Sequence, residues 1–504
     1  MSANKESFDY PDLDRPRTQL EDFKYSHLAL IIIAGIFATT LAQPQVMGKL
    51  PLQHLLKDNL HVSREAMARF FFLCGLAWYF KPFAGILTDA FPLFGTRRRY
   101  YLLASAIFAG VSWVGIMLVP KTYDALLYGC IIINFFMVIA STVIGAFLVE
   151  SGQRLGATGR LTALRQTVSN ACQLINGPVS GYLAGLSFGL ASGVNAAIVV
   201  SVVPIAYLFM REKRVREENA EPLKNAKIQL GIIFRSPNLW FAILFIFLFY
   251  FSPGFSTPLY YKQTDQLKFS QEFIGWLQVA SGAFGILGAY VYSRLIKRLD
   301  MMTMIVAGIL TFALGNLLYL MYSGATMAWI IESQNGFFFT LAEIALLDLA
   351  ARATPKGCEG LGYSLMLSAR NLALFGADWL GSFLADKQKW SFETLVFLNV
   401  GTTLVVLLLL PILPKLLMNA KDKVMIATGD ESVAGTAGVS QAELRQVLER
   451  LDIEDSGSWP AKGDISVDAI SRATGQDPVR IAEILYEIRR DNERARRQED
   501  NTKG

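Results

Sequence analysis

The chain has 504 residues and a formal net charge of +5, and 53% of its residues are hydrophobic while only 18% are charged. Soluble domains carry about 25% charged residues, so the composition excludes an ordinary soluble enzyme. The apolar residues fall in runs of about 20, which is long enough to cross the hydrocarbon core as helices. The composition therefore predicts an all-α integral membrane protein whose last part, 415–504, is a cytoplasmic tail of water-soluble composition.

The N-terminal segment and the few cysteines and histidines limit which targeting signals and metal sites the chain can have. Residues 1–26 are polar and acidic, without the apolar run of a signal peptide or the acid-poor character of a transit peptide. We expect them to form a short cytoplasmic tail. The four cysteines show no paired spacing typical of disulfides or zinc sites, and three histidines are few for a metal cluster. We therefore expect no cofactor and no metal site.

Twelve segments have the length and apolarity of membrane-spanning helices. The first six are predicted at 27–47, 65–89, 100–119, 124–149, 162–185 and 191–210. The second six are predicted at 238–259, 272–293, 302–322, 326–349, 361–384 and 392–414. The basic segment 211–237 divides them, so we expect an N-terminal bundle at 27–210, a cytoplasmic linker at 211–237 and a C-terminal bundle at 238–414.

Lys and Arg are distributed unevenly between the loops of the two sides. The loops after spans two, four, six, eight and ten hold 17 of them, whereas the loops after the odd spans hold 8. Because basic loops stay in the cytoplasm, both termini are predicted to be cytoplasmic. The location predicted from this pattern is the inner (plasma) membrane.

An internal repeat supports the two halves. A shift of 198 residues places Glu150 on Asp348 and Arg154 on Arg352. Charges in such places are rare, so matched charges at one offset indicate a duplicated unit. Parallel repeats of six spans are a feature of the major facilitator architecture. In span five, glycines four residues apart, from Gly177 to Gly185, are expected to allow close helix packing.

The segment between spans two and three carries a family motif. It reads WYFKPFAGILTDAFPLFGTRRRYY, with Gly85-x-Leu87-x-Asp89, then Gly95 and a triple Arg. It resembles the loop motif of the major facilitator superfamily, with a longer gap between the Asp and the second Gly. The Lys-Pro pair, the Phe-Pro insertion and the upstream segment AQPQVMGKLPLQHLLKDNLHVS resemble the folate–biopterin transporter family. The resemblance is close over 42–101 and loose over the twelve spans.

This resemblance implies a secondary active transporter of folate- or pterin-like organic anions, with proton-coupled symport by alternating access. The expected partners are the small-molecule substrate, protons and the lipid bilayer, and we expect a monomer without nucleic acid. No ATP-binding motif is present, which argues against primary pumping. The alternatives are a carrier of another solute (a sugar, drug or lipid precursor), a membrane receptor or scaffold that signals through its tail, and, weakest, a membrane enzyme.

One group of charged residues is expected to gate the cytoplasmic side. Their pairing would hold one state and break in the other. The i, i+4 pairs share a helix face, and simple local ion pairs or topology signals are the alternative. The candidates are Asp89, Arg97, Arg98, Arg99, Glu150, Arg154, Asp348 and Arg352.

A second group is expected to contact substrate. A charge within a span is costly unless it is paired or faces water, and folates carry carboxylates that cations would bind. Asp378 and Glu343 are also proton-coupling candidates, with a structural ion pair between helices as the alternative, just as a snorkelling or paired lysine is for Lys81. The candidates are Lys81, Trp78, Arg165, Gln166, Arg370, Asn371, Asp378 and Glu343.

The tail is expected to be partly helical. The stretches SQAELRQVLERLDI and 478–497 read as short amphipathic helices. Residues 421–504 carry 13 basic and 17 acidic residues, so they form no net basic patch for nucleic acid. The sequence predicts a small regulatory or partner-binding module or a partly disordered segment.

Overall fold

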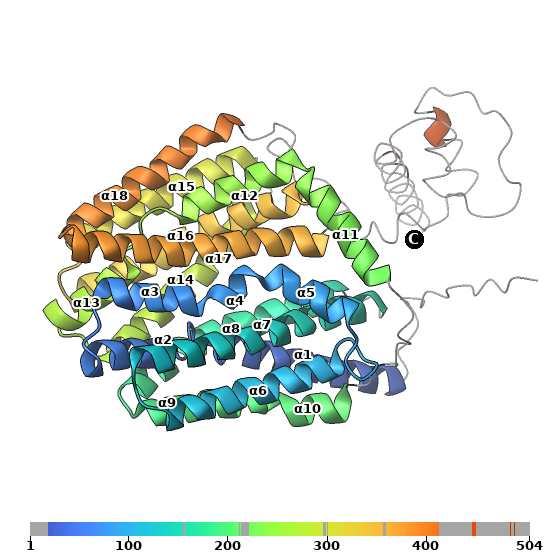
Figure 1. Cartoon of the computed structure of the whole chain (residues 1–504). Helices are drawn as coiled ribbons and strands as arrows, with labels where there is room; N and C mark the ends of the chain where they lie inside the picture. Colours follow the sequence, from blue (N-terminus) through green and yellow to red (C-terminus); the bar gives the residue numbers. More distant parts are fainter. Residues whose placement is uncertain are drawn as a thin grey trace, which may run out of the picture. The chain divides into compact units, whose positions relative to one another are not determined.

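The computed structural model describes residues 19–154, 158–210, 212, 221–295, 299, 301–355, 359–412, 446–449, 484 and 488. By its internal contacts the chain divides into two units, Met1–Ala420 and Lys421–Gly504. In the second unit residues 446–449 are helical, within the first predicted tail helix, and Val447, Leu448 and Ile488 are buried. The described part of the first unit consists of helices and their connections (Figure 1).

The N-terminal half of the first unit runs from α1 to α10. Its elements are α1 (Gln19–Leu41), α2 (Lys49–His54), the π-helix η1 (Leu55–Asn59), α3 (Arg64–Cys74), α4 (Leu76–Tyr79), α5 (Lys81–Ala90), α6 (Arg99–Leu118), α7 (Tyr123–Arg154), α8 (Thr158–Ala184), α9 (Phe188–Val200) and α10 (Val202–Phe209).

A linker helix, α11 (Glu221–Phe234), leads to the C-terminal half. That half consists of α12 (Pro237–Tyr250), α13 (Ser256–Tyr261), the π-helix η2 (Lys262–Gln266), α14 (Gln271–Leu295), α15 (Met301–Leu317), η3 (Leu318–Met321), α16 (Ala325–Ala353), α17 (Glu359–Lys387), α18 (Phe392–Val405) and η4 (Val406–Ile412).

Every predicted span coincides with a helix or with a broken run of helices. Among the described residues, six helices are long and apolar enough to cross a membrane, and a seventh qualifies if α11 and α12, bent by 75° at their junction, count as one. The six are Arg99–Leu118, Tyr123–Leu148, Phe188–Phe209, Gln271–Tyr292, Met301–Met321 and Phe392–Leu410. The structure therefore has the helices of a multi-pass membrane protein, and the count of twelve spans stays a prediction.

Serine side chains fix the starts of several helices. The hydroxyl of Ser63 accepts a hydrogen bond from the amide of Ala66 at the start of α3. Ser187, Ser236, Ser270 and Ser391 do the same for α9, α12, α14 and α18. Such caps satisfy amides that the first helical turn leaves unpaired, and each contributes about 1 kcal/mol.

The two most extensive helix contacts between the halves are α8 on α14 and α3 on α17. The first contact depends on glycine, because a methyl group added to Gly177 would overlap the carbonyl oxygen of Gly275. Gly181 likewise faces the backbone of Gln271, whereas Gly185 meets only its own helix. The expected packing role is thus confirmed for Gly177 and Gly181.

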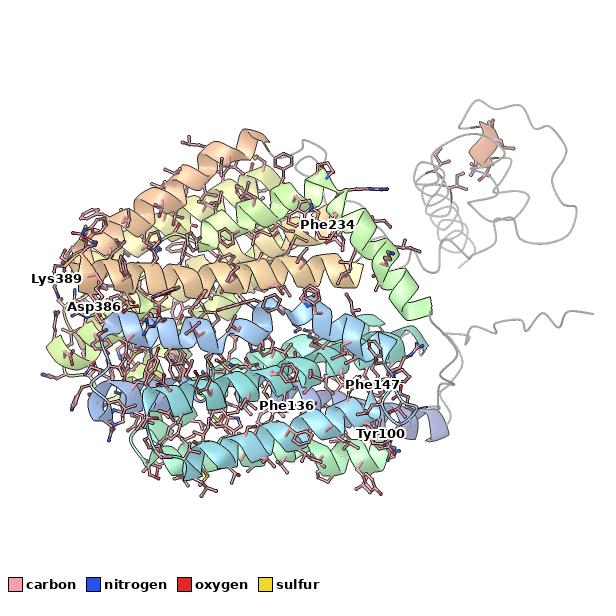
Figure 2. The ribbon with its side chains drawn as sticks, in the orientation of Figure 1. Tyr100, Phe136, Phe147, Phe234, Asp386 and Lys389 are labelled. Carbon is pink, nitrogen blue, oxygen red and sulfur yellow. The ribbon has the colours of Figure 1, made fainter. Side chains whose placement is uncertain are left out.

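The first unit has two ends, named here by the segments that lie there. The linker end holds α11, and Phe234 on that helix marks it (Figure 2). The far end is opposite and holds α2, η1, α13 and η2, with Asp386 and Lys389 nearby (Figure 2). The long helices of both halves run between these two ends (Figure 1).

The far end contains a second repeat. A shift of 207 residues superimposes the bounds of α2 on α13 and of η1 on η2, and the first residue of α3 on that of α14. The capping serines Ser63 and Ser270 correspond, and so do His61 and Lys268, whose φ angles are 50° and 56°. A positive φ is rare for residues with a side chain, so its recurrence identifies one duplicated segment in each half. We call these segments the far-end hairpins: each is a short helix and a π-helix that turn into the next long helix, α2–η1 before α3 and α13–η2 before α14.

Candidate functional site

A break in the second predicted span positions Trp78 and Lys81. Helix α3 ends before Gly75, and α5 begins at Lys81 with Pro82 in its first turn, where proline needs no amide partner. The Lys81 ammonium lies 5.2 Å from the centroid of the Trp78 ring and 3.2 Å from the hydroxyl of Ser141 on α7. The indole N–H of Trp78 donates to Asn134 at 3.0 Å. Both predicted residues therefore have fixed positions against α7.

Arg370 on α17 lies in a dense polar cluster of the C-terminal half. It forms an ion pair with Glu343 on α16 and donates to the side chain of Asn371 at 3.1 Å. Its guanidinium stands 4.8 Å from the centroid of the Tyr250 ring. The buried Nε of Arg370 has no hydrogen-bond partner, so one N–H of this cation is available to a ligand.

Tyr363 connects the charges of the two halves. The charges of Arg165 on α8 and of Arg370 and Glu343 act on its hydroxyl. Arg165 and Lys81 are also close enough to repel each other, and the hydroxyl of Ser368 donates to the carbonyl of Trp78 across the halves at 3.2 Å. The structure therefore brings Lys81, Arg165, Arg370 and Glu343 to one region, whereas the side chain of Gln166 lies outside the described residues.

A small cavity of about 10 Å³ borders Arg370. Its remaining lining is mostly aliphatic, with one tyrosine ring. These residues come from α12, α16 and α17: Ile246, Tyr250, Leu346, Leu347, Ala350, Met366 and Leu367. Such a space holds about one water and lies well below the roughly 300–1,000 Å³ of ligand pockets, so in this conformation it does not admit a substrate beside Arg370.

Asp378 lies closer to the far end, on the same helix as Arg370. Its carboxylate accepts from the amide of Thr257 at 2.9 Å and from its hydroxyl at 2.6 Å, in the first turn of α13. A carboxylate at a helix N-terminus is stabilised by the free amides there. Asp378 thus anchors the far-end hairpin of the C-terminal half, and its predicted substrate or proton role stays a prediction.

At the linker end, the predicted gating residues that the structure describes contact groups outside the predicted set. The amides of Arg97, Arg98 and Arg99 all donate to the carboxylate of Glu212 at 2.9–3.0 Å, at the start of α6. Asp348 accepts from the hydroxyl of Tyr292 at 3.3 Å. The side chains of four further candidates lie outside the described residues: Asp89, Glu150, Arg154 and Arg352.

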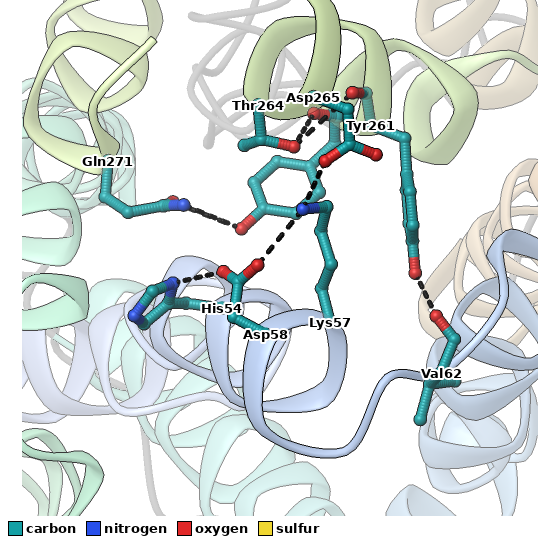
Figure 3. Close-up of polar contacts among 9 residues, drawn as sticks. His54, Lys57, Asp58, Val62, Tyr261, Thr264, Asp265 and Gln271 are labelled. Carbon is teal, nitrogen blue, oxygen red and sulfur yellow. Dashed lines mark hydrogen bonds and ion pairs between the residues drawn. The ribbon is translucent and has the colours of Figure 1, made fainter. Parts of the chain in front are cut away.

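An ion pair joins the halves at the far end (Figure 3). The Nζ of Lys57 in η1 lies 2.5 Å from a carboxylate oxygen of Asp265 in η2 and 3.1 Å from one of the neighbouring Asp58. The other carboxylate oxygen of Asp58 lies 2.6 Å from Nδ1 of His54. The hydroxyl of Tyr261 donates to the carbonyl of Val62 beside them (Figure 3). The two repeated hairpins therefore close on each other.

Other bonds between the halves lie near this end or at middle depth. The carboxylate of Asp386 accepts from the amide of Glu65 at 2.8 Å, and Trp379 donates to the side chain of Glu65 at 3.1 Å. Asn176 donates to Gln278 at 3.4 Å. The Ser368–Trp78 bond lies at middle depth.

Comparison with known proteins identifies the family. A model of the BT1 family matches residues 44–432. The chain belongs to the BT1 family. This BT1-family protein is 25% identical over 391 residues to the folate-biopterin transporter of Synechocystis, with 73% of this chain and 78% of that protein covered. It is 24% identical to folate transporter 1 of Plasmodium falciparum, with 70% and 72% covered.

Solved structures show the fold of this BT1-family protein. The nucleoside transporter NupG matches with a TM-score of 0.58 at 10% identity, over 77% of this chain and 98% of that one. A D-xylose-proton symporter matches with a TM-score of 0.57 at 14% identity, over 77% and 97%. The predicted major facilitator fold and the resemblance to folate–biopterin transporters are confirmed, and the chain is a multi-pass membrane transporter rather than an enzyme.

Sequence reasoning missed three elements of the site. Glu212 stands in the basic linker, where the sequence shows only a run of charges. Lys57 contributes only to the count of basic residues in the loops, although the shared spacing of Pro51 and Ser63 with Pro258 and Ser270 indicates a repeat whose second copy holds Asp265. Glu332 is an acid within a predicted span that the candidate residues do not include.

Proposed function

We propose that this protein carries folate- or pterin-like organic anions across the inner (plasma) membrane by proton-coupled alternating access, as a monomer. The linker end is cytoplasmic in this proposal, because the basic loops lie there, and the far end faces outward. The single observation that carries the proposal is that each half places a cation on an aromatic ring, Lys81 on Trp78 and Arg370 on Tyr250. The Ser368–Trp78 bond joins the two segments that carry these cations, in a chain whose family relatives are named folate transporters.

The two rings and two cations suit the two parts of a folate. A flat pterin can stack on an aromatic ring, and the carboxylates of its glutamate can bind Lys81 and Arg370. Because Glu343 already occupies part of the Arg370 fork, a substrate carboxylate must compete with it. The likeness to nucleoside and sugar carriers concerns the fold and does not choose among substrates.

The test is uptake of labelled folate into proteoliposomes, with and without an inward proton gradient. We expect saturable uptake that the gradient stimulates. A charge-assisted hydrogen bond contributes about 1.5–3 kcal/mol, so Lys81→Met should weaken affinity by about 10- to 100-fold. The single change Arg370→Gln leaves Glu343 buried without its cation, which can destabilise the fold. The double variant Arg370→Gln with Glu343→Gln leaves no unpaired charge and is therefore the fair test of Arg370.

Lys387→Ala is the matched control, because this exposed lysine lies at the other end of α17. It should leave folate affinity unchanged. Absence of folate uptake by correctly folded protein would overturn the substrate assignment and direct a screen of neutral solutes. Undiminished affinity in Lys81→Met and in the Arg370→Gln/Glu343→Gln double variant would show that the anion site lies elsewhere.

A further inference from the structure

Glu332 is an acid inside the C-terminal half that the proposed substrate site does not use. It lies on α16, between the α15–α16 connection and the middle of the bundle. The hydroxyls of Tyr319 and Tyr322 donate to its two carboxylate oxygens, each at 3.3 Å. The two rings stack on each other with centroids 5.7 Å apart and planes within 7°. The carboxyl group is therefore held by neutral donors on both oxygens.

No cation pairs with Glu332 in the described part of the chain. The charged groups of the neighbouring elements are engaged elsewhere. Lys262 of η2 faces Glu393 of α18 at 3.6 Å, and Asp265 of η2 binds Lys57. The titratable groups that act on Glu332 are the two tyrosines alone. A charge inside the membrane without a counter-ion is costly, and such acids mark proton relays in transporters.

The repeat shows that the fold does not require an acid at this position. The 198-residue shift that relates spans four and ten places Asn134 on Glu332, and the Ile-Ile pair before each residue corresponds. Asn134 is fully buried and satisfied by Trp78 and by the carbonyl of Cys74. At this repeat position a neutral amide thus serves as the buried polar group of the N-terminal half, whereas the C-terminal half has a group that can change charge.

Hydrogen bonds lead from Glu332 to the far-end hairpin. The amide of Gln263 in η2 donates to the hydroxyl of Tyr322 at 2.7 Å, and Gln263 is two residues from Asp265. A second path of side-chain amides runs from α16 to the start of the same hairpin. Its members are Asn335, Asn316, Asn399 and the carbonyl of Pro253. Both ends of the α13–η2 segment are therefore tied to the region of Glu332.

We propose that Glu332 binds the proton that drives transport, and that its protonation favours closure of α13–η2 against α2–η1 at the far end. When the carboxylate is ionised, the tyrosine hydroxyls and water must solvate it, which favours an open far end. When it is protonated, the carboxyl group is neutral and the dry, closed arrangement costs less. The proposal rests on the proposed proton-coupled transport, and it names the residue that performs the coupling.

The first test compares proton-driven uptake with substrate exchange in proteoliposomes. Glu332→Gln should reduce the stimulation by a proton gradient by about tenfold or more, because no proton binds, while exchange of labelled for unlabelled folate persists. Glu393→Gln, an acid on the same half that faces solvent, should retain the full stimulation. Equal stimulation in Glu332→Gln and wild type would overturn the proposal. Loss of exchange in every protein, wild type included, would instead overturn the substrate assignment.

The second test needs no substrate. Spin labels at Asn59 and Gln266, the exposed last residues of η1 and η2, report the far-end distance in a cysteine-substituted background. Wild type should shift toward the short distance between about pH 8.5 and about pH 5.5. Glu332→Gln should stay short, and Tyr322→Phe should show a smaller shift. Because the imidazole of His54 also lies at this end, 2.6 Å from Asp58, the comparison of variants decides. A wild-type distance independent of pH, or a Glu332→Gln response equal to wild type, would refute the coupling.

Discussion

The side chain of Arg370 has two competing uses. In the structure its fork is occupied by Glu343 and Asn371, while its Nε has no partner. If a substrate carboxylate competes with Glu343, Glu343→Gln should bind folate about tenfold more tightly, because the neutral amide holds Arg370 less strongly. Without folate the variant should be less stable than wild type, since a buried cation loses its counter-ion. Isothermal titration and thermal unfolding with and without folate measure both effects.

Glu272→Gln is the control for this measurement, because Glu272 is exposed in the first turn of α14. It should change neither affinity nor stability. Weaker folate binding in Glu343→Gln would show that Glu343 positions Arg370 for the substrate rather than competing with it.

Candidate site residues could be identified from the sequence only where a charged residue stands in an apolar segment, because such residues are rare. Lys81, Arg370 and Glu343 stood out because charges within apolar segments are costly. Their partners could not be assigned, because Arg370 and Glu343 lie 27 residues apart and meet only when α16 and α17 pack. Glu332 satisfied the same criterion and was still missed, since its two tyrosine partners lie in a connection that carries no charge pattern.

The packing of helix α8 on helix α14 depends on glycines, of which Gly177 makes the tightest contact. A side chain at Gly177 would meet the backbone of Gly275, which cannot rotate away. Gly177→Val should therefore separate the halves near the far end, with a cost of about 1–3 kcal/mol typical of overpacking, and slow transport strongly. Gly145→Val on α7, where no atom lies within 4 Å of the added carbon, is the matched control. Uptake rates and far-end thiol labelling in both variants measure the effect, and normal uptake in Gly177→Val would contradict it.

The elements themselves were largely predictable, and their interruptions were not. Runs of apolar residues match helices because a bilayer leaves the backbone no other means of hydrogen bonding. The breaks at Gly75 and at 251–255 leave no mark in a hydropathy window, because the broken segments remain apolar. The sequence predicts a loop at α2–η1, and it places α13–η2 across the end of the span 238–259 and the loop after it, since π-helices of five residues have no periodic pattern of their own.

One of the contacts that join the two halves at the far end is the ion pair between Lys57 of η1 and Asp265 of η2. The side chain of Lys57 is 12% exposed and that of Asp265 is 49% exposed. Burial lowers the pKa of Lys57, but hydrogen bonds and charge attraction from Asp265 and Asp58 outweigh it and raise the pKa above 10.5. A raised lysine pKa means that the contribution of the ammonium is complete below about pH 10.5. It is lost only as the pH rises through the folded value.

The raised pKa of Lys57 distinguishes the ion pair from the proposed proton site, because a change in pH near neutrality does not change the charge of Lys57. Lys57→Met should shift the far end toward the open state by the same amount at about pH 7 and about pH 9, because Lys57 stays charged throughout. Exchanging the charges, Lys57→Asp with Asp265→Lys, should recover much of the closed state that either single change loses. Spin-label distances at Asn59 and Gln266 measure both. If the exchange of charges does not restore the closed state, the ion pair adds little to the contact between the halves. The Tyr261–Val62 hydrogen bond and the packing of the two segments then hold the far end closed.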